Sequence, residues 1–68
     1  MRLPQLKALR ERALLTQSEL AAKAGVSEVT INRIEADRHD PRFSTIRKLA
    51  LALGVSPEEL GQPTEKAS

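Results

Sequence analysis

The sequence contains no cysteine, tryptophan or tyrosine, and it has one phenylalanine and one histidine among its 68 residues. The absence of cysteine excludes disulfides and thiolate metal sites, and it fits a reducing cytoplasm. The single histidine, His39, has no Cys or second His near it, so neither a zinc site nor a catalytic triad can be built around it. The sequence also has no glycine-rich phosphate loop. We therefore expect no enzyme, no metal and no cofactor.

Long hydrophobic runs are also missing. No apolar run approaches the ~20 residues that span a bilayer, and the first residues, MRLPQLKALR, lack the apolar core of a signal peptide. Hydrophobic residues make up 40% of the chain and charged residues 29%, which is ordinary for a soluble globular domain. We expect a cytoplasmic protein with no membrane partner. Residues 1–61 are predicted to form one domain and residues 62–68 a flexible tail.

Residues 17–36 predict two short helices joined by a tight turn. Thr16 and Glu19 have the T-x-x-E spacing of a capping box, in which each side chain bonds a backbone N–H group at the helix start. The first helix therefore begins at about Gln17. Gly25 stands where a left-handed residue commonly ends a helix.

The second helix of this pair is predicted from Ser27 to Ala36. Ser27 is a good N-cap, and the spacing turns Ile31 and Ile34 toward the core. Glu28 then lies at the exposed N-terminal end. At ~100° per residue, the face opposite the isoleucines carries Val29, Asn32, Arg33 and Ala36, with Thr30 and Glu35 on the flanks.

The side chains of this exposed face have the chemistry needed to read base edges in a major groove. Arg33 can bond guanine, Asn32 can bond adenine, and Val29 can contact a thymine methyl group. Glu28 repels phosphates but can accept a bond from cytosine N4, so it would restrict the choice of base. The alternative is an ordinary amphipathic helix with one exposed valine, and the pattern alone leaves both open.

The charge is unevenly distributed along the chain. Residues 1–48 carry ten Lys and Arg against six Asp and Glu, whereas residues 49–68 carry one against three. A basic N-terminal part suits a polyanion. The segment 28–42 is not itself basic, so non-specific DNA affinity should be weak and strongly salt-sensitive if DNA binds there.

Two runs of residues together resemble the helix-turn-helix domain of the phage-repressor family, also called Cro-like or XRE. They are Gln17, Leu20, Ala21, Gly25, Val26, Ser27, Ile31, Ile34 and Glu35, followed by Leu49, Ala50, Leu53, Gly54 and Val55. The resemblance covers about residues 5–61. It implies a compact, all-α, lambda-repressor-like domain of five helices that binds double-stranded DNA. Helices two and three would form the helix-turn-helix, with Ser27 to Ala36 as the recognition helix.

The resemblance also implies roles for residues outside the base-reading face. Arg10 is expected to pair with Glu35, and Gln17 to donate to a phosphate at the helix start; otherwise Gln17 is simply a polar residue there. Further contacts to the DNA backbone are expected from Ser18, Ser27, Thr30, Arg38 and Arg42. The family often has Asn-Gly where this chain has Ala36-Asp37, which leaves the end of the recognition helix open.

The remaining helices follow from periodicity and capping residues. The first is predicted from about Pro4 to Ala13, with a buried stripe of Leu3, Leu6, Leu9 and Ala13. Leu14 and Leu15 are expected to pack inward after it. Ser44 is predicted to cap a fourth helix above Phe43, and Ser56 to open a fifth. The buried face of the fourth helix would carry Ile46, Leu49, Ala50 and Leu53.

These observations favour a sequence-specific transcriptional regulator. We expect a small dimeric repressor or autoregulator that binds a palindromic operator. Leu51, predicted to be exposed, and the last helix are the best candidates for a homodimer contact. The alternative is a protein-interaction module or an antitoxin-type subunit that needs a partner protein, because a fold alone does not fix a function.

Overall fold

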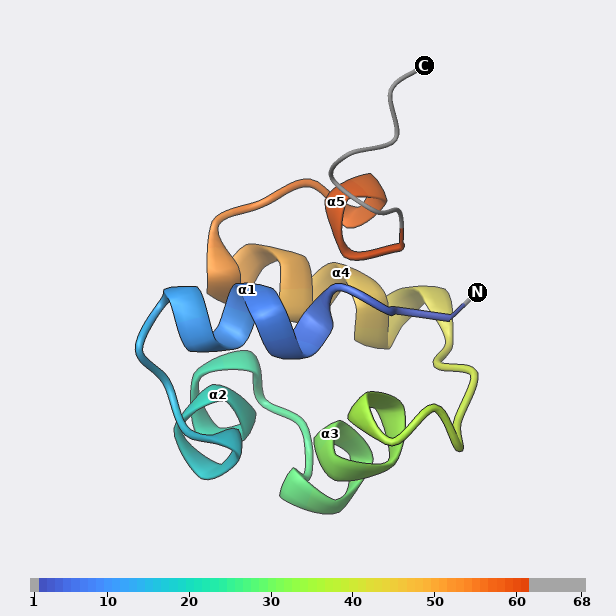
Figure 1. The fold of residues 1–68 in the computed structure, drawn as a ribbon, viewed down its shortest axis with the longest axis horizontal. Helices are drawn as coiled ribbons and strands as arrows, with labels where there is room; N and C mark the ends of the chain where they lie inside the picture. Colours follow the sequence, from blue (N-terminus) through green and yellow to red (C-terminus); the bar gives the residue numbers. More distant parts are fainter. Residues whose placement is uncertain (1, 62–68) are drawn as a thin grey trace.

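The computed structural model describes residues 2–61, which form five helices and no strand (Figure 1). The helices are α1 (Leu6–Arg12), α2 (Gln17–Ala24), α3 (Glu28–Glu35), α4 (Phe43–Leu53) and α5 (Pro57–Gly61). The predicted all-α fold with a helix-turn-helix at α2 and α3 is confirmed. The tail predicted at residues 62–68 lies outside the described residues. Within residues 2–61, no helix has the length and apolar character needed to cross a membrane.

Every helix contributes one large, fully buried side chain to a single core. These side chains are Leu6, Leu20, Ile31, Leu49 and Leu60. Around them α2 packs against α3 and α4, α4 against α5, and α1 against both α3 and α5. Figure 1 shows α2 and α3 on one side of the domain and α5 on the opposite side. The helix-turn-helix is therefore supported by α4, which contacts α2, and by α1, which contacts α3, while α5 packs against α1 and α4.

The start of α2 and the turn after it follow the local sequence signals. The Thr16 hydroxyl accepts from the Glu19 N–H at 3.0 Å, and a Glu19 carboxylate oxygen accepts from the Thr16 N–H at 2.9 Å. Gly25 has a φ of 75°, so it ends α2 in the left-handed conformation that glycine adopts at little cost. The Ser27 hydroxyl then accepts from the Thr30 N–H at 3.1 Å and caps α3. Capping box, turn and N-cap are all confirmed.

The end of α3, which the sequence left open, is set by Asp37. Ala36 keeps a right-handed conformation with a φ of −82°, and Asp37 takes the left-handed one with a φ of 61°. The N–H of Asp37 donates to the carbonyl of Ile34 at 3.0 Å, and that of Arg38 to Arg33 at 2.9 Å. These two bonds form a Schellman motif with aspartate in the position that usually holds glycine.

Leu14 adopts the same left-handed conformation after α1, with a φ of 61°, and its side chain is 88% exposed. The prediction that Leu14 packs inward is therefore wrong. Its N–H donates to Glu11 and that of Leu15 to Arg10, so the chain reverses at Leu14 and only Leu15 packs against the core. Ala13 is also exposed rather than buried, because α1 ends at Arg12 and Ala13 is its C-cap.

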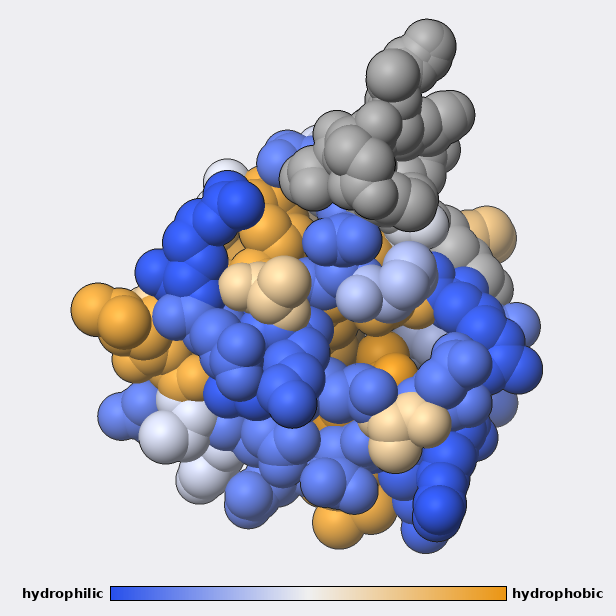
Figure 2. Space-filling view, viewed as in Figure 1, coloured by the Kyte–Doolittle hydropathy of each residue, from blue (hydrophilic) through white to orange (hydrophobic). Residues whose placement is uncertain are grey.

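The start of α4 also differs from the prediction. Arg42 is the N-cap and Phe43 the first helical residue, so Ser44 lies in the first turn rather than at the cap. Phe43 is 77% exposed, which contradicts the prediction that it packs beneath the helix. The buried face of α4 begins only at Ile46, one turn further along. Leu51 is exposed as predicted, and Figure 2 shows apolar atoms in separate places on a mostly hydrophilic face.

Candidate nucleic-acid interface

The solvent-facing side of α3 brings the predicted base-reading residues together. Val29 is 57% exposed, and Glu28, Asn32 and Arg33 are exposed as well. With Gln17 from the start of α2, these four side chains line a shallow hollow of about 260 Å³. The hollow is therefore built from two helices, and its walls offer a carboxylate, two amides, a guanidinium and an aliphatic group.

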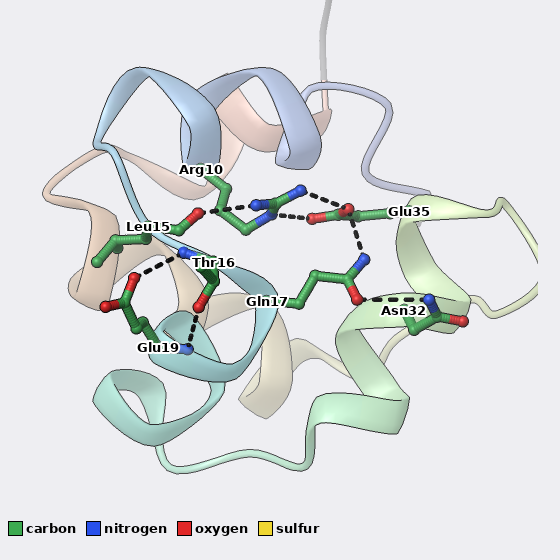
Figure 3. A network of polar contacts seen from close by, with 7 residues as sticks. All are labelled: Arg10, Leu15, Thr16, Gln17, Glu19, Asn32 and Glu35. Carbon is green, nitrogen blue, oxygen red and sulfur yellow. Dashed lines mark hydrogen bonds and ion pairs between the residues drawn. The ribbon is translucent and has the colours of Figure 1, made fainter.

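Behind this surface, Arg10 of α1 and Glu35 of α3 form a two-bonded ion pair (Figure 3). Arg10 Nε lies 2.6 Å from Glu35 Oε2, and Arg10 Nη2 lies 3.1 Å from Oε1. The two side chains are only 10% and 5% exposed. The hydrogen bond to Glu35 raises the pKa of Arg10 above its ordinary value, although burial opposes this, so the guanidinium stays charged.

The ion pair is continued outward by two amide side chains, Gln17 and Asn32. Gln17 Nε2 donates to Glu35 Oε1 at 2.9 Å, and Asn32 Nδ2 donates to Gln17 Oε1 at 3.4 Å. Arg10 Nη1 also donates to the carbonyl of Leu15 at 2.7 Å. Figure 3 shows these bonds as one chain that runs from the end of α1, through α3 and the start of α2, to the exposed face of α3. Sequence reasoning gave Gln17 a phosphate contact but missed its place in this network.

The other residues predicted to contact the DNA backbone lie at or near the starts of α2 and α3 and in the segment after α3. Ser18 is exposed in the first turn of α2, and Ser27 is exposed at the N-cap of α3, where it also accepts from the Thr30 hydroxyl at 3.4 Å. N–H groups at helix starts favour anions. Arg38 and Arg42 are exposed in the segment that joins α3 to α4.

Arg2 contacts Asp37 at the end of α3, and sequence reasoning missed this contact. Its Nη1 donates to the Asp37 carboxylate at 2.7 Å and to the Asp37 carbonyl at 2.8 Å. The hydrogen bond to the Asp37 side chain raises the pKa of Arg2. No sequence spacing signals this pair, because 35 residues separate its members. Among residues 2–61, no group of three His, Cys, Asp or Glu side chains is arranged to hold a metal ion.

Two helices joined by a tight left-handed turn, with the second helix exposed along one face, define a helix-turn-helix unit. The sequence model of the helix-turn-helix family matches residues 6–60, so the chain belongs to this family. This match confirms the resemblance to the helix-turn-helix domain of the phage-repressor (Cro-like, XRE) family.

Named relatives include bacterial regulators. The chain is 41% identical over 58 residues to the uncharacterized HTH-type transcriptional regulator y4dJ of Sinorhizobium fredii, covering 85% of this chain and 75% of that protein. It is 49% identical over 57 residues to the HTH-type transcriptional repressor RghR of Bacillus subtilis, covering 82% of this chain but only 42% of RghR.

A solved structure has the same fold. The restriction-modification controller protein C.AhdI of Aeromonas hydrophila superposes with a TM-score of 0.80 at 32% identity, covering 82% of this chain and 85% of that one. Its likeness extends over both the helix-turn-helix and the helices that support it.

Proposed function

We propose that this protein is a sequence-specific DNA-binding transcriptional regulator, a small repressor or autoregulator. The observation that carries the proposal is the hollow on α2 and α3, where four predicted base-reading side chains converge on the exposed face of a helix-turn-helix. The names of the relatives, a transcriptional regulator and a repressor, support it. A protein that regulates transcription in a bacterial cell would act in the cytoplasm.

In this proposal residues 1–61 form the DNA-binding domain and α3 enters the major groove. Arg33, Asn32 and Val29 would read guanine, adenine and a thymine methyl group, and Glu28 would accept from cytosine. The backbone would be held at the helix starts and in the loop after α3 by Gln17, Ser18, Ser27, Thr30, Arg38 and Arg42. Contacts to the DNA backbone position the protein, whereas contacts to base edges determine which sequence it binds.

We also propose that the regulator acts as a homodimer on a palindromic operator. Half-sites about one helical turn apart, ~34 Å, need two copies of the recognition helix on the same face of the DNA. Leu51 supports this proposal, since it is a leucine with 77% exposure on α4, the helix that packs against α5. An apolar side chain in this position suits a two-fold contact between copies.

The test is selection of DNA from a randomised pool by the purified protein, followed by sequencing and affinity measurements on the selected site. Enrichment of an inverted repeat is expected. Arg33→Ala should relax the preference at one base pair and cost about 1–3 kcal/mol there. Arg47→Ala removes an exposed arginine from α4 and is the matched control, expected to leave the selected sequence unchanged.

The other outcomes of this test are equally informative. Equal loss on every sequence for Arg33→Ala would remove Arg33 from base reading. Enrichment of a single, unrepeated half-site would contradict the homodimer. The absence of enrichment at any salt concentration would contradict the proposed function and favour a protein-interaction module or an antitoxin-type subunit that needs a partner protein.

A further inference from the structure

We propose that Glu35 and Gln17 are positioning residues that fix the side-chain amide of Asn32 so that it reads adenine. This inference rests on the proposed function and explains why Asn32 would prefer adenine. It is carried by the direction of the hydrogen bonds that lead from Asn32 through Gln17 to Glu35 (Figure 3).

The direction of these bonds follows from the carboxylate at their inner end. An ionised carboxylate only accepts hydrogen bonds, so the Gln17 amide must turn its NH₂ group toward Glu35, and its Nε2 lies 2.9 Å from Oε1. A flipped amide would place the Gln17 carbonyl oxygen against the carboxylate oxygen. The orientation of the Gln17 amide is therefore set by charge, and its oxygen must face Asn32.

The orientation of Gln17 in turn determines which groups Asn32 can offer to a base. Because Gln17 Oε1 is an acceptor, the Asn32 amide must turn its Nδ2 toward it, and the two atoms lie 3.4 Å apart. This bond uses one of the two Nδ2 hydrogens. The second hydrogen and the oxygen Oδ1 remain for the DNA. A donor beside an acceptor matches adenine, which presents N7 as acceptor and N6 as donor in the major groove.

The inner end of the chain is held firmly enough to impose its orientation. Glu35 receives two hydrogen bonds from Arg10, and Arg10 is itself tied to the Leu15 carbonyl at 2.7 Å. Both charged side chains are nearly buried. The outer end lies where a base would approach, since Gln17 and Asn32 both line the hollow with Arg33. The nearly buried carboxylate of Glu35 thus sets the orientation of the exposed Asn32 amide through Gln17.

The test compares the preference at each operator position for five proteins on the site selected by the wild type. The variants are Asn32→Ala, Gln17→Met, their double mutant and Ser18→Ala. Methionine matches glutamine in shape but has no amide, so Gln17→Met breaks the chain while the buried ion pair stays intact. Ser18→Ala is the matched control, because it removes a predicted phosphate contact beside Gln17 without touching the chain.

We expect the wild type to prefer adenine at one position by about tenfold or more. Asn32→Ala and Gln17→Met should both remove most of that preference, and the double mutant should lose no more of it than Asn32→Ala alone. Ser18→Ala should weaken binding to all sequences by the same factor and keep the preference. In the free protein, Gln17→Met should also shift the NMR signals of the Asn32 side-chain amide.

Retention of the full adenine preference by Gln17→Met would overturn the positioning role while leaving the proposed function intact. An unchanged preference at every position in Asn32→Ala would overturn the inference as well, since Asn32 would then read no base. Failure of the wild type to select any sequence would instead contradict the proposed function itself.

Discussion

The ends of α2 and α4 differ from the ends of α1 and α3 in the residue that reverses the chain. All four ends use a residue with positive φ, and in each the next N–H donates to the carbonyl five residues earlier. Gly25 and Gly54 fill this position after α2 and α4, whereas Leu14 and Asp37 fill it after α1 and α3. The same positive-φ geometry thus ends four helices, and only two of these ends carry glycine, which adopts it without strain.

The two ends without glycine are those that flank the polar chain of Figure 3. The reversal at Leu14 brings the Leu15 carbonyl within 2.7 Å of Arg10, and the reversal at Asp37 follows directly after Glu35 and Ala36. The glycine ends adopt the same positive φ at little cost. At the other two ends side chains hold the reversal, because Arg10 donates to the carbonyl of Leu15 and Arg2 donates to the carbonyl and carboxylate of Asp37.

The largest effect is expected from Arg10→Met, which removes the contacts that hold the end of α1. Glu35 would be left nearly buried without its cation, so unfolding free energy should fall by about 3–5 kcal/mol, measured by urea denaturation. The double mutant Arg10→Met, Glu35→Leu removes both charges and is the control, expected to recover most of the loss. A double mutant as unstable as Arg10→Met would show that packing, not charge, holds this end.

A smaller loss of unfolding free energy is expected when the glycine that ends α2 or α4 is replaced by a residue with a side chain. Gly25→Ala and Gly54→Ala should each cost about 1–2 kcal/mol of unfolding free energy, because alanine is strained at positive φ. A Cβ atom built at either position meets nothing within 4 Å, so conformation alone sets the cost. Denaturation of both variants checks this, and strongly unequal losses would contradict it.

The reverse change should stabilise the domain. Leu14→Gly should raise the unfolding free energy by about 0.5–1 kcal/mol, because glycine relieves the strain and the leucine side chain, 88% exposed, loses little burial. Leu14→Ala is the matched control, since it shortens the side chain but keeps the strained conformation, and it should bring no comparable gain. An equal gain from both variants would point to the exposed side chain rather than the backbone.

The smallest effect is expected on DNA affinity, from a substitution of Asp37 at the end of α3. Asp37→Asn keeps a residue that tolerates the left-handed conformation but removes a negative charge beside the recognition helix. Affinity for all DNA sequences should rise by about two- to threefold at low salt, and the gain should vanish as salt is added. Titrations of wild type and variant at several salt concentrations measure this. A gain confined to one sequence would contradict a purely electrostatic role.

Most of the fold could be predicted from the sequence because its signals are local. Thr16 with Glu19, Gly25 and Ser27 each act within one turn of chain, and the spacing of Ile46, Leu49 and Ala50 marks a buried face directly. The errors at Ala13, Leu14 and Phe43 all lie at helix ends. For Ala13, periodicity continued the buried stripe past the point where the backbone turns away.

The candidate site was predictable in part. Helical geometry was enough to place the exposed face of α3, and the pairing of Arg10 with Glu35 followed from the resemblance to the family. The bond from Gln17 to Glu35 joins residues 18 positions apart, and the bond from Asn32 to Gln17 joins residues 15 apart. Such contacts depend on how three helices are placed in space, and no pattern within one helix encodes them.

The single fully buried side chain in each helix has a consequence for how the domain unfolds. Leu6, Leu20, Ile31, Leu49 and Leu60 share one core, so no helix can detach without exposing the side chains of the others. Opening of α3 alone would cost nearly as much as global unfolding, and its slowest amide protons should exchange with those of α4. In the proposed function α3 then reaches DNA already ordered, so little conformational entropy is lost on binding.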